Sequence, residues 1–339
     1  MGRNHAGISV VVASFNGSEH IAEQLTSIAG QTLAPLEIIV SDDRSTDATV
    51  ERVREFAARS SVPVVLIQSQ HQLGYPENFL RAALRARGEL IAFSDQDDVW
   101  LPEKLSRGAA AFEDPAVMLW VHEARVVDEQ LRPLPDSRFH TGFARRAAHA
   151  DPLHPLHGSH SVFRAELLRY LPPDDRPASV YGPHPAEHDE WIKFAAVALG
   201  RVAWHRDPLM LYRRHRGALT TTAPVLPRGQ VLGGLDQKRH VYAVRAARER
   251  GAYLRRRGDA PECIGVRPQL LAAANRYERL VPVLVRRLET RQAKTRLRRT
   301  RSLGEAVSRG DYRRLRDGGL GLWAFVQDLY RVASRAPAV

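Results

Sequence analysis

The sequence predicts an α/β fold in which a mainly parallel sheet carries helices on both faces, followed by a basic α-helical extension. In the first hundred residues, apolar runs of strand length alternate with segments of helical period, which is typical of βαβ units. The charge also divides the chain. Residues 1–224 carry 24 Lys and Arg against 28 Asp and Glu, a net charge of −4, whereas residues 225–339 carry 26 against 10, a net charge of +16.

The first part of the chain contains four strand-length apolar runs, each entering a polar turn. The predicted strands are residues 8–13, 36–40, 64–67 and 90–93, with helices that begin near Ile21, near Val50 and at Asn78. These runs are mostly apolar and do not alternate regularly with polar residues, although Ser9 and Glu37 interrupt two of them. We therefore expect the strands to form a buried parallel sheet.

The regular alternation stops after Pro102. We expect strands at 117–127 and 201–212, a short strand entering a helix at 161–170, a helix at 191–199, and Pro-rich loops at 132–155 and 172–185. The second loop is long enough to move as a lid. The sequence thus predicts a globular domain at residues 1–222 and a basic amphipathic helical region at residues 223–339.

The basic helical region has two interpretations. Its helices place Arg opposite an apolar stripe, and the last one adds Trp323 and Tyr330 on its apolar side. Such helices suit an anionic membrane surface, but the same stripe would also pack onto the first domain. A basic tail can also meet nucleic acid, although this one has no zinc-finger spacing and no RNP-type aromatic motif.

Composition indicates the cellular compartment of the protein. The single cysteine, Cys263, allows no internal disulfide, and residues 1–7 are short and polar, unlike a secretory signal. No apolar run approaches the roughly 18 to 20 residues needed to span a bilayer. We expect a cytoplasmic protein.

Three carboxylates, Asp95, Asp97 and Asp98, crowd the end of the predicted strand 90–93. Like charges this close repel one another and require a cation. Oxygen ligands without nearby Cys or His favour Mg²⁺ or Mn²⁺, which complete their shell with phosphate oxygens and water. A solvated acidic turn that caps the helix near Pro102 is the alternative.

The first two predicted strands also end in polar residues suited to a nucleotide. One strand leads to Ala13, Ser14 and Asn16, and the other leads to Asp42, Asp43 and Arg44. Ligands of open α/β sheets bind at this edge. The sequence has no G-x-G-x-x-G fingerprint, Walker A loop or G-x-S-x-G elbow, so it predicts a nucleotide and a metal without a dinucleotide site.

Two further groups are candidates for chemistry. Asp189, in the acidic run 187–190, is placed to act as a general base, although acids in a first helical turn also interact favourably with the helix dipole. His215 follows a predicted strand end and is a candidate metal ligand.

In this order, the motifs resemble the inverting nucleotide-sugar glycosyltransferases of family 2, which have the GT-A fold, and within them bacterial rhamnosyltransferase-like members. The matching segments are 11–16, 40–47, Gly74 with Asn78, 94–100 with Pro102 and 104–105, 188–191, and 208–213 with His215. The resemblance covers about residues 7–217. Arg44 departs from it, because the family usually has glycine at this position, and Glu190 stands where an aromatic residue is common.

The resemblance implies a role for each candidate. Ala13 and Asp42 would contact the base, Asp97 the ribose, and Asp189 would deprotonate the acceptor. The expected donor-binding residues are Ala13, Ser14, Asn16, Asp42, Asp43, Arg44, Asn78, Asp95 and Asp97, and the expected metal ligands are Asp97, Asp98 and His215.

The expected activity is metal-dependent, inverting transfer of a sugar from a nucleotide-diphosphate sugar, with dTDP-rhamnose first and UDP-sugars next. The acceptor would be a hydroxyl of a glycan or lipid-linked saccharide in cell-surface polysaccharide synthesis, at the inner face of the cell membrane, with no nucleic acid partner. The alternatives are a sugar-phosphate nucleotidyltransferase and a non-catalytic basic protein that binds membranes or nucleic acid.

Overall fold

The computed structural model describes residues 7–134, 158–215, 237–293, 295–313 and 320–333. The chain divides into two compact units. Unit 1 comprises Met1–Pro173 and Glu187–Thr222, and unit 2 comprises Asp174–Ala186 and Ala223–Val339. The domain boundary predicted near residue 222 lies outside the described residues and stays a prediction.

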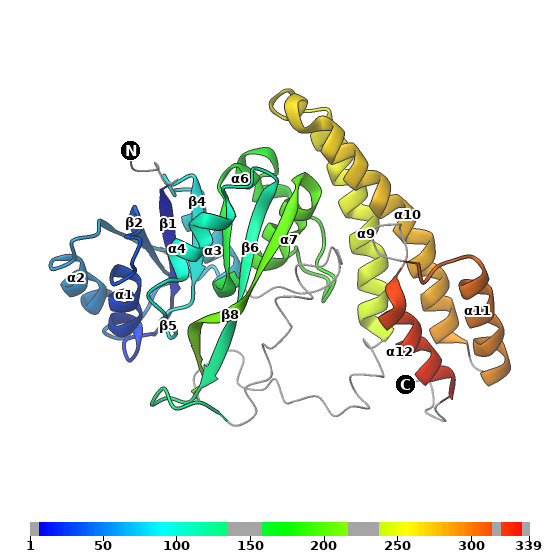
Figure 1. Cartoon of the computed structure of the whole chain (residues 1–339), viewed down its shortest axis with the longest axis horizontal. Helices are drawn as coiled ribbons and strands as arrows, with labels where there is room; N and C mark the ends of the chain where they lie inside the picture. The colour runs from blue at the N-terminus through cyan, green and yellow to red at the C-terminus, as the bar shows by residue number, and fades with distance from the viewer. Residues whose placement is uncertain (1–6, 135–157, 216–236, 294, 314–319, 334–339) are drawn as a thin grey trace. The chain divides into compact units, whose positions relative to one another are not determined.

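Unit 1 is built on a sheet in the order β3-β2-β1-β4-β7-β6-β8-β5 (Figure 1). Its strands are β1 (Ile8–Ser14), β2 (Glu37–Asp42), β3 (Val64–Gln68), β4 (Leu90–Ser94), β5 (Val99–Trp100), β6 (Val117–Val127), β7 (Ser161–Arg164) and β8 (Arg201–Arg213). The first four strands are mutually parallel, β7 and β5 run antiparallel to their neighbours, and β6 pairs in parallel with β8. The mainly parallel α/β fold predicted from the sequence is confirmed.

Helices cover this sheet. They are α1 (Ile21–Ala29), α2 (Thr49–Ala57), α3 (Tyr75–Ala83), α4 (Lys104–Ala111), α6 (Glu166–Tyr170) and α7 (His188–Leu199), with a 3₁₀ turn, η2 (Gly158–His160), before β7. Ile21, Leu25 and Ile28 of α1 are fully buried against a core that includes Val10 and Val12 of β1. Burying these side chains drives the helix onto the sheet.

The strand register brings three polar strand ends together. Ser14 of β1 pairs with Asp42 of β2, and Val12 of β1 pairs with Ser94 of β4. Because the strands are parallel, the residues after β1, β2 and β4 leave the sheet at the same edge, where ligands of open α/β sheets bind.

Unit 2 is helical, with α9 (Gln237–Gly258), a 3₁₀ segment η4 (Pro261–Val266), α10 (Arg267–Gln292), α11 (Arg296–Ser308) and α12 (Gly321–Ala333). Part of its positive charge is neutralised internally. Arg287 and Arg291 of α10 both contact Asp328 of α12, and Arg286 pairs with Asp311. No helix in the described part of the chain is long and apolar enough to cross a membrane.

The segment Asp174–Ala186 belongs to the helical unit, although the sequence suggests a lid loop of the first domain there. The backbone N–H of Ala178 donates to Glu249 Oε2 of α9 at 2.7 Å, and Arg256 pairs with Asp175 at 2.9 Å. The segment is therefore held by contacts to a helix more than sixty residues further along the chain.

Candidate active site

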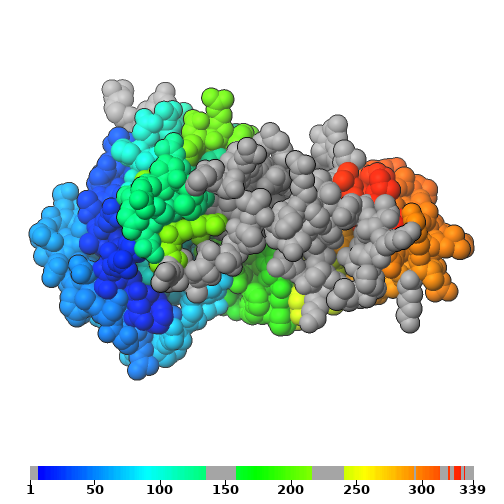
Figure 2. All heavy atoms as spheres, turned by 90° about the horizontal axis from the view of Figure 1, so that it is seen from below, coloured from blue at the N-terminus to red at the C-terminus, as the bar shows by residue number. Residues whose placement is uncertain are grey.

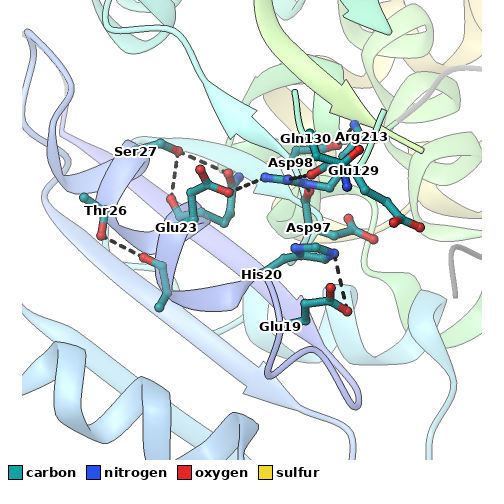
Figure 3. Close-up of polar contacts among 12 residues, drawn as sticks. Glu19, His20, Glu23, Thr26, Ser27, Asp97, Asp98, Glu129, Gln130 and Arg213 are labelled. Atoms are coloured by element: carbon teal, nitrogen blue, oxygen red, sulfur yellow. Dashed lines mark hydrogen bonds and ion pairs between the residues drawn. The ribbon is translucent and has the colours of Figure 1, made fainter. Parts of the chain in front are cut away.

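The loop after β4 and the end of β8 place Asp97, Asp98 and Arg213 together (Figure 3). Arg213 is almost fully buried. Its Nε donates to the Asp97 carbonyl at 2.8 Å, its Nη1 donates to the Glu129 carbonyl at 2.6 Å, and its Nη2 contacts the Glu23 carboxylate of α1. The planar guanidinium therefore fixes three chain segments around the acidic loop.

Asp98 is buried beneath this network. Its Oδ1 accepts the backbone N–H of Arg213 at 3.1 Å, whereas its Oδ2 is buried and has no hydrogen-bond partner among the described residues. Burial, followed by the charges of Asp97 and Asp95, raises the pKa of Asp98 well above its usual range. The Asp98 carboxyl therefore favours its neutral form, and only a nearby cation would favour its ionised form.

Asp97 and His215 are in direct contact. His215 Nε2 lies 2.8 Å from Asp97 Oδ2, and this hydrogen bond raises the pKa of the imidazole. The His20 ring lies edge-on to His215, with the ring centroids 4.9 Å apart. One carboxylate and one imidazole therefore meet beside the acidic loop, as predicted ligands of the same ion should.

The acidic loop and His215 supply some, but not all, of the ligands that a divalent cation needs. The unpartnered Asp98 oxygen and the three crowded acids call for positive charge, and Asp97 with His215 supplies two adjacent donors. Among the described residues, no three His, Cys, Asp or Glu side chains converge closely enough to hold a metal by themselves. Asp97 and His215 are in direct contact, and the role of Asp97, Asp98 and His215 as metal ligands stays a prediction. Such a pair suits an ion that takes its remaining ligands from water and phosphate.

Asp95 faces a different neighbour. Its carboxylate accepts a hydrogen bond from the side chain of Ser159 in η2, while burial and the nearby charge of Asp97 raise its pKa to about 6. No role was predicted for Ser159, because nothing in residues 158–160 indicates that this turn returns to the end of β4.

At the ends of β1 and β2, the predicted nucleotide ligands form an internal network. Asp42 accepts hydrogen bonds from the hydroxyl of Ser14 at 3.1 Å and from the hydroxyl and backbone N–H of Ser45 at 2.5 and 2.9 Å. Asp43 accepts the backbone N–H groups of Leu73 and Gly74, at 2.7 and 2.8 Å. These carboxylates shape the loops before α2 and α3, and their contact with a nucleotide stays a prediction.

The other predicted nucleotide ligands differ in exposure. Asn78 is buried, and its amide is bonded to the hydroxyl and carbonyl of Ser41. Ala13 is partly exposed at the end of β1. Asn16 and Arg44 are exposed and have left-handed backbones, with φ of 47° and 67°. Glycine adopts this conformation without a steric penalty, which explains why the family usually has glycine at position 44.

Asp189 lies in the first turn of α7, and its Oδ1 accepts the N–H of Glu190 at 2.6 Å. Burial, followed by the charges of Glu187 and Glu190, raises its pKa to about 8. Tyr75, at the start of α3, is hydrogen-bonded to Glu187 and is 40% exposed. Tyr75 and Glu187 therefore flank the candidate base, although no role was predicted for either residue.

Comparison with known proteins identifies the class. Residues 9–171 match the model of glycosyl transferase family 2, and the α/β unit that contains them has the GT-A fold. An uncharacterized protein of Mycobacterium tuberculosis is 32% identical over 212 residues, covering 61% of this chain and 59% of that protein. The chain thus spans about three fifths of the length of such curated relatives.

A second relative has a named activity. The Escherichia coli UDP-Glc:alpha-D-GlcNAc-diphosphoundecaprenol beta-1,3-glucosyltransferase WfgD is 34% identical over 98 residues, or 29% of this chain and 38% of that protein.

Solved structures share the fold. Staphylococcus aureus TarS 1–349 in complex with UDP-GlcNAc is similar with a TM-score of 0.52 and 20% identity, over 97% of this chain and 92% of that chain. The mannosyltransferase PcManGT from Pyrobaculum calidifontis, in complex with GDP-Man and Mn²⁺, has a TM-score of 0.50 and 18% identity, over 98% and 87%.

Replacing Arg213 should destabilise unit 1. In Arg213→Met, two carbonyls and the Glu23 carboxylate lose their donors in a buried site, which should lower the free energy of unfolding by about 2–4 kcal/mol. Urea unfolding would measure this loss. Arg125→Met, at an exposed position of β6, is the control and should change stability by less than about 0.5 kcal/mol. Equal stability of the two variants would contradict the role of Arg213.

Asp189 should reduce stability increasingly as the pH rises. Its folded-state pKa of about 8 lies above the unfolded value of about 3.9, so the ionised carboxylate disfavours the folded state above that lower value, and the penalty levels off above pH 8. In urea unfolding at pH 5, 6.5 and 8, the free energy of unfolding of Asp189→Asn should increase relative to that of the wild type at each higher pH. The control is Asp207→Asn, at an exposed residue. A difference independent of pH would show that Asp189 is not desolvated.

Proposed function

We propose that this chain is an inverting nucleotide-sugar glycosyltransferase in which Asp189 is the general base. The observation that carries the proposal is a partly buried carboxylate, with its pKa raised to about 8, close enough to Asp95 for their charges to interact. A base with a pKa near the working pH is suited to removing a hydroxyl proton. The family 2 match of the same unit supplies the reaction class.

In the proposed reaction, Asp189 accepts the proton of an acceptor hydroxyl. The acceptor oxygen forms a bond to the anomeric carbon as the bond from that carbon to the diphosphate breaks on the opposite face. The configuration therefore inverts, and the nucleoside diphosphate leaves with the electron pair. Glu187 and Tyr75 are placed beside the base, where they would orient the acceptor hydroxyl.

Asp97 and His215 are the residues that would hold a Mg²⁺ or Mn²⁺ ion, and such an ion would favour the ionised form of the neighbouring Asp98 carboxyl. When bound, the ion would stabilise the negative charge that develops on the departing diphosphate. Arg213 keeps the Asp97 carbonyl and the Asp98 carboxylate in place, so the loop needs little rearrangement when the donor binds.

For the donor we propose a nucleotide-diphosphate sugar, with dTDP-rhamnose and UDP-sugars as the first candidates. The sequence relative with a named activity is a UDP-Glc transferase, which supports the uridine series. The solved structures of similar fold hold UDP-GlcNAc in one case and GDP-Man in another. The acceptor would be a glycan or lipid-linked saccharide in surface polysaccharide synthesis, consistent with the diphosphoundecaprenol acceptor in the name of the Escherichia coli relative.

We also propose that the helical unit meets the inner, anionic face of the cell membrane through α11. Leu297 is 81% exposed and Val307 is 49% exposed, and Arg298 and Arg301 lie on the same helix. Side chains of α11, in orange, reach the surface of the face shown in Figure 2. Exposed apolar side chains among arginines are typical of interfacial helices. The side chains of Trp323 and Tyr330, predicted for the same role, lie outside the described residues.

A donor panel tests the proposed function. We expect one nucleoside diphosphate among UDP, dTDP and GDP, with its sugar, to raise the melting temperature only when Mn²⁺ or Mg²⁺ is present, because a ligand at a hundred times its Kd adds about 2.7 kcal/mol. Asp189→Asn should keep this shift and lose sugar transfer, whereas Asp97→Ala should lose the metal-dependent shift. A folded wild-type protein that responds to none of these ligands would overturn the proposal.

Liposome flotation tests the membrane proposal. The chain should bind vesicles that contain anionic phosphatidylglycerol, and Leu297→Ser combined with Arg298→Gln and Arg301→Gln should weaken binding at least tenfold, at about 1 kcal/mol per arginine. The control is Ile264→Ser, which removes another highly exposed apolar side chain, in η4. An equal loss of vesicle binding in both variants would contradict the proposal that α11 meets the membrane. Binding to neutral vesicles alone would contradict it as well.

A further inference from the structure

Unit 1 buries a lysine that the proposed chemistry does not use. Lys104, at the start of α4, is fully buried, and its Nζ lies 3.5 Å from the centroid of the Trp100 ring. Among the described residues it forms no ion pair within 4 Å. Its Nζ donates instead to the backbone carbonyl of Ser159 at 2.6 Å. A buried ammonium costs several kcal/mol, so this arrangement calls for an explanation.

The carbonyl that Lys104 holds belongs to the residue that holds Asp95. The side chain of Ser159 is hydrogen-bonded to the Asp95 carboxylate, and Ser159 is almost fully buried. Burial lowers the pKa of Lys104 well below its usual value, against the opposing effect of the Asp98 and Asp95 carboxyl groups. The lysine therefore supports the donor side of the site by fixing the turn that positions Asp95.

The same turn touches the residues around the candidate base. A Cβ placed on Gly158 would lie 2.6 Å from His188 Nε2 and 3.5 Å from the Cβ of Asp189. The His188 ring is in turn stacked on Phe79 at 4.3 Å, which leaves it little room to move. The absence of a side chain at position 158 thus lets η2 pack directly against the start of α7.

We propose that Ser159 and Lys104 are positioning residues, and that η2 aligns the donor-side carboxylate Asp95 with the base Asp189. This inference rests on the proposed function. Lys104 anchors the Ser159 carbonyl, the Ser159 hydroxyl orients the Asp95 carboxylate, and Gly158 sets how closely the turn approaches Asp189. The donor and acceptor sides of the site are thus built on one three-residue element.

The proposed roles predict separate effects on the Kd for the nucleoside diphosphate and on kcat. Ser159→Ala removes the hydroxyl that orients Asp95, so the Kd for the nucleoside diphosphate selected in the panel, measured by calorimetry with Mn²⁺, should rise about tenfold. Lys104→Met removes the anchor of the turn and should raise the same Kd by at least as much. The kcat of Ser159→Ala at saturating donor should fall less than threefold. Gly158→Ala displaces His188 and Asp189, so its kcat should fall more than tenfold while its Kd stays within twofold of the wild-type value.

Ser9→Ala is the matched control, because Ser9 is a fully buried serine whose hydroxyl donates to the Glu37 carboxylate at 2.7 Å, outside the site. It should lose stability to the same extent as Ser159→Ala and keep the wild-type Kd. The wild-type titration is read first, since a wild-type chain that binds no nucleotide overturns the proposed function itself. If the wild type binds, then an unchanged Kd in both Ser159→Ala and Lys104→Met overturns only the positioning role.

If Lys104→Met does not fold, Ser159→Ala and Gly158→Ala still decide the question. A rise in Kd together with a fall in kcat in both variants would show that η2 is only structural support, and would overturn the proposal. A rise in Kd confined to Ser159→Ala, with a fall in kcat confined to Gly158→Ala, is the expected outcome.

Discussion

Electrostatic repulsion at the end of β4 is the constraint on which the rest of unit 1 depends. Asp95, Asp97 and Asp98 leave the sheet within four residues, and burial makes their mutual repulsion more costly than it would be in water. The fold answers with hydrogen-bonding groups from distant segments. Arg213, at the end of β8, donates its backbone N–H to Asp98, and His215, just after it, contacts Asp97. Lys104 of α4 anchors the turn beside Asp95. The later part of the chain is therefore needed to complete a site that begins at the fourth strand.

The sequence predicted the fold well because the fold depends on patterns that a sequence displays. Apolar runs at 8–13, 36–40, 64–67 and 90–93 became β1 to β4. The expectation that all four strands are buried is wrong for β3, which lies at the edge of the sheet and leaves Val65 41% exposed. The acidic strand end was also identifiable, because three adjacent carboxylates have no role in packing.

Much of the site's internal bonding was not predictable. A carboxylate at a strand end is expected to face a ligand, yet Asp43 accepts two loop N–H groups, and which backbone donors reach it depends on a loop thirty residues away. Ser159 and Tyr75 carry no motif, and they reach the site only through tertiary packing. Glu187 lies in the same acidic run as Asp189, but its contact with Tyr75 was not predictable. Likewise, the positive charge of unit 2 suggests a surface, whereas Arg287 and Arg291 are committed to Asp328 inside the unit.

The contact between Asp174–Ala186 and α9 has a consequence for how such proteins diversify. A recombination event that joined a new C-terminal half after residue 222 would separate Ala178 from Glu249 and Asp175 from Arg256, and would leave a backbone N–H without its acceptor. The helical unit is thus a discontinuous module, inherited intact only when an internal loop of the transferase region is exchanged with it. Shuffling of C-terminal halves between relatives should therefore succeed mainly among chains whose loops before α7 are already compatible.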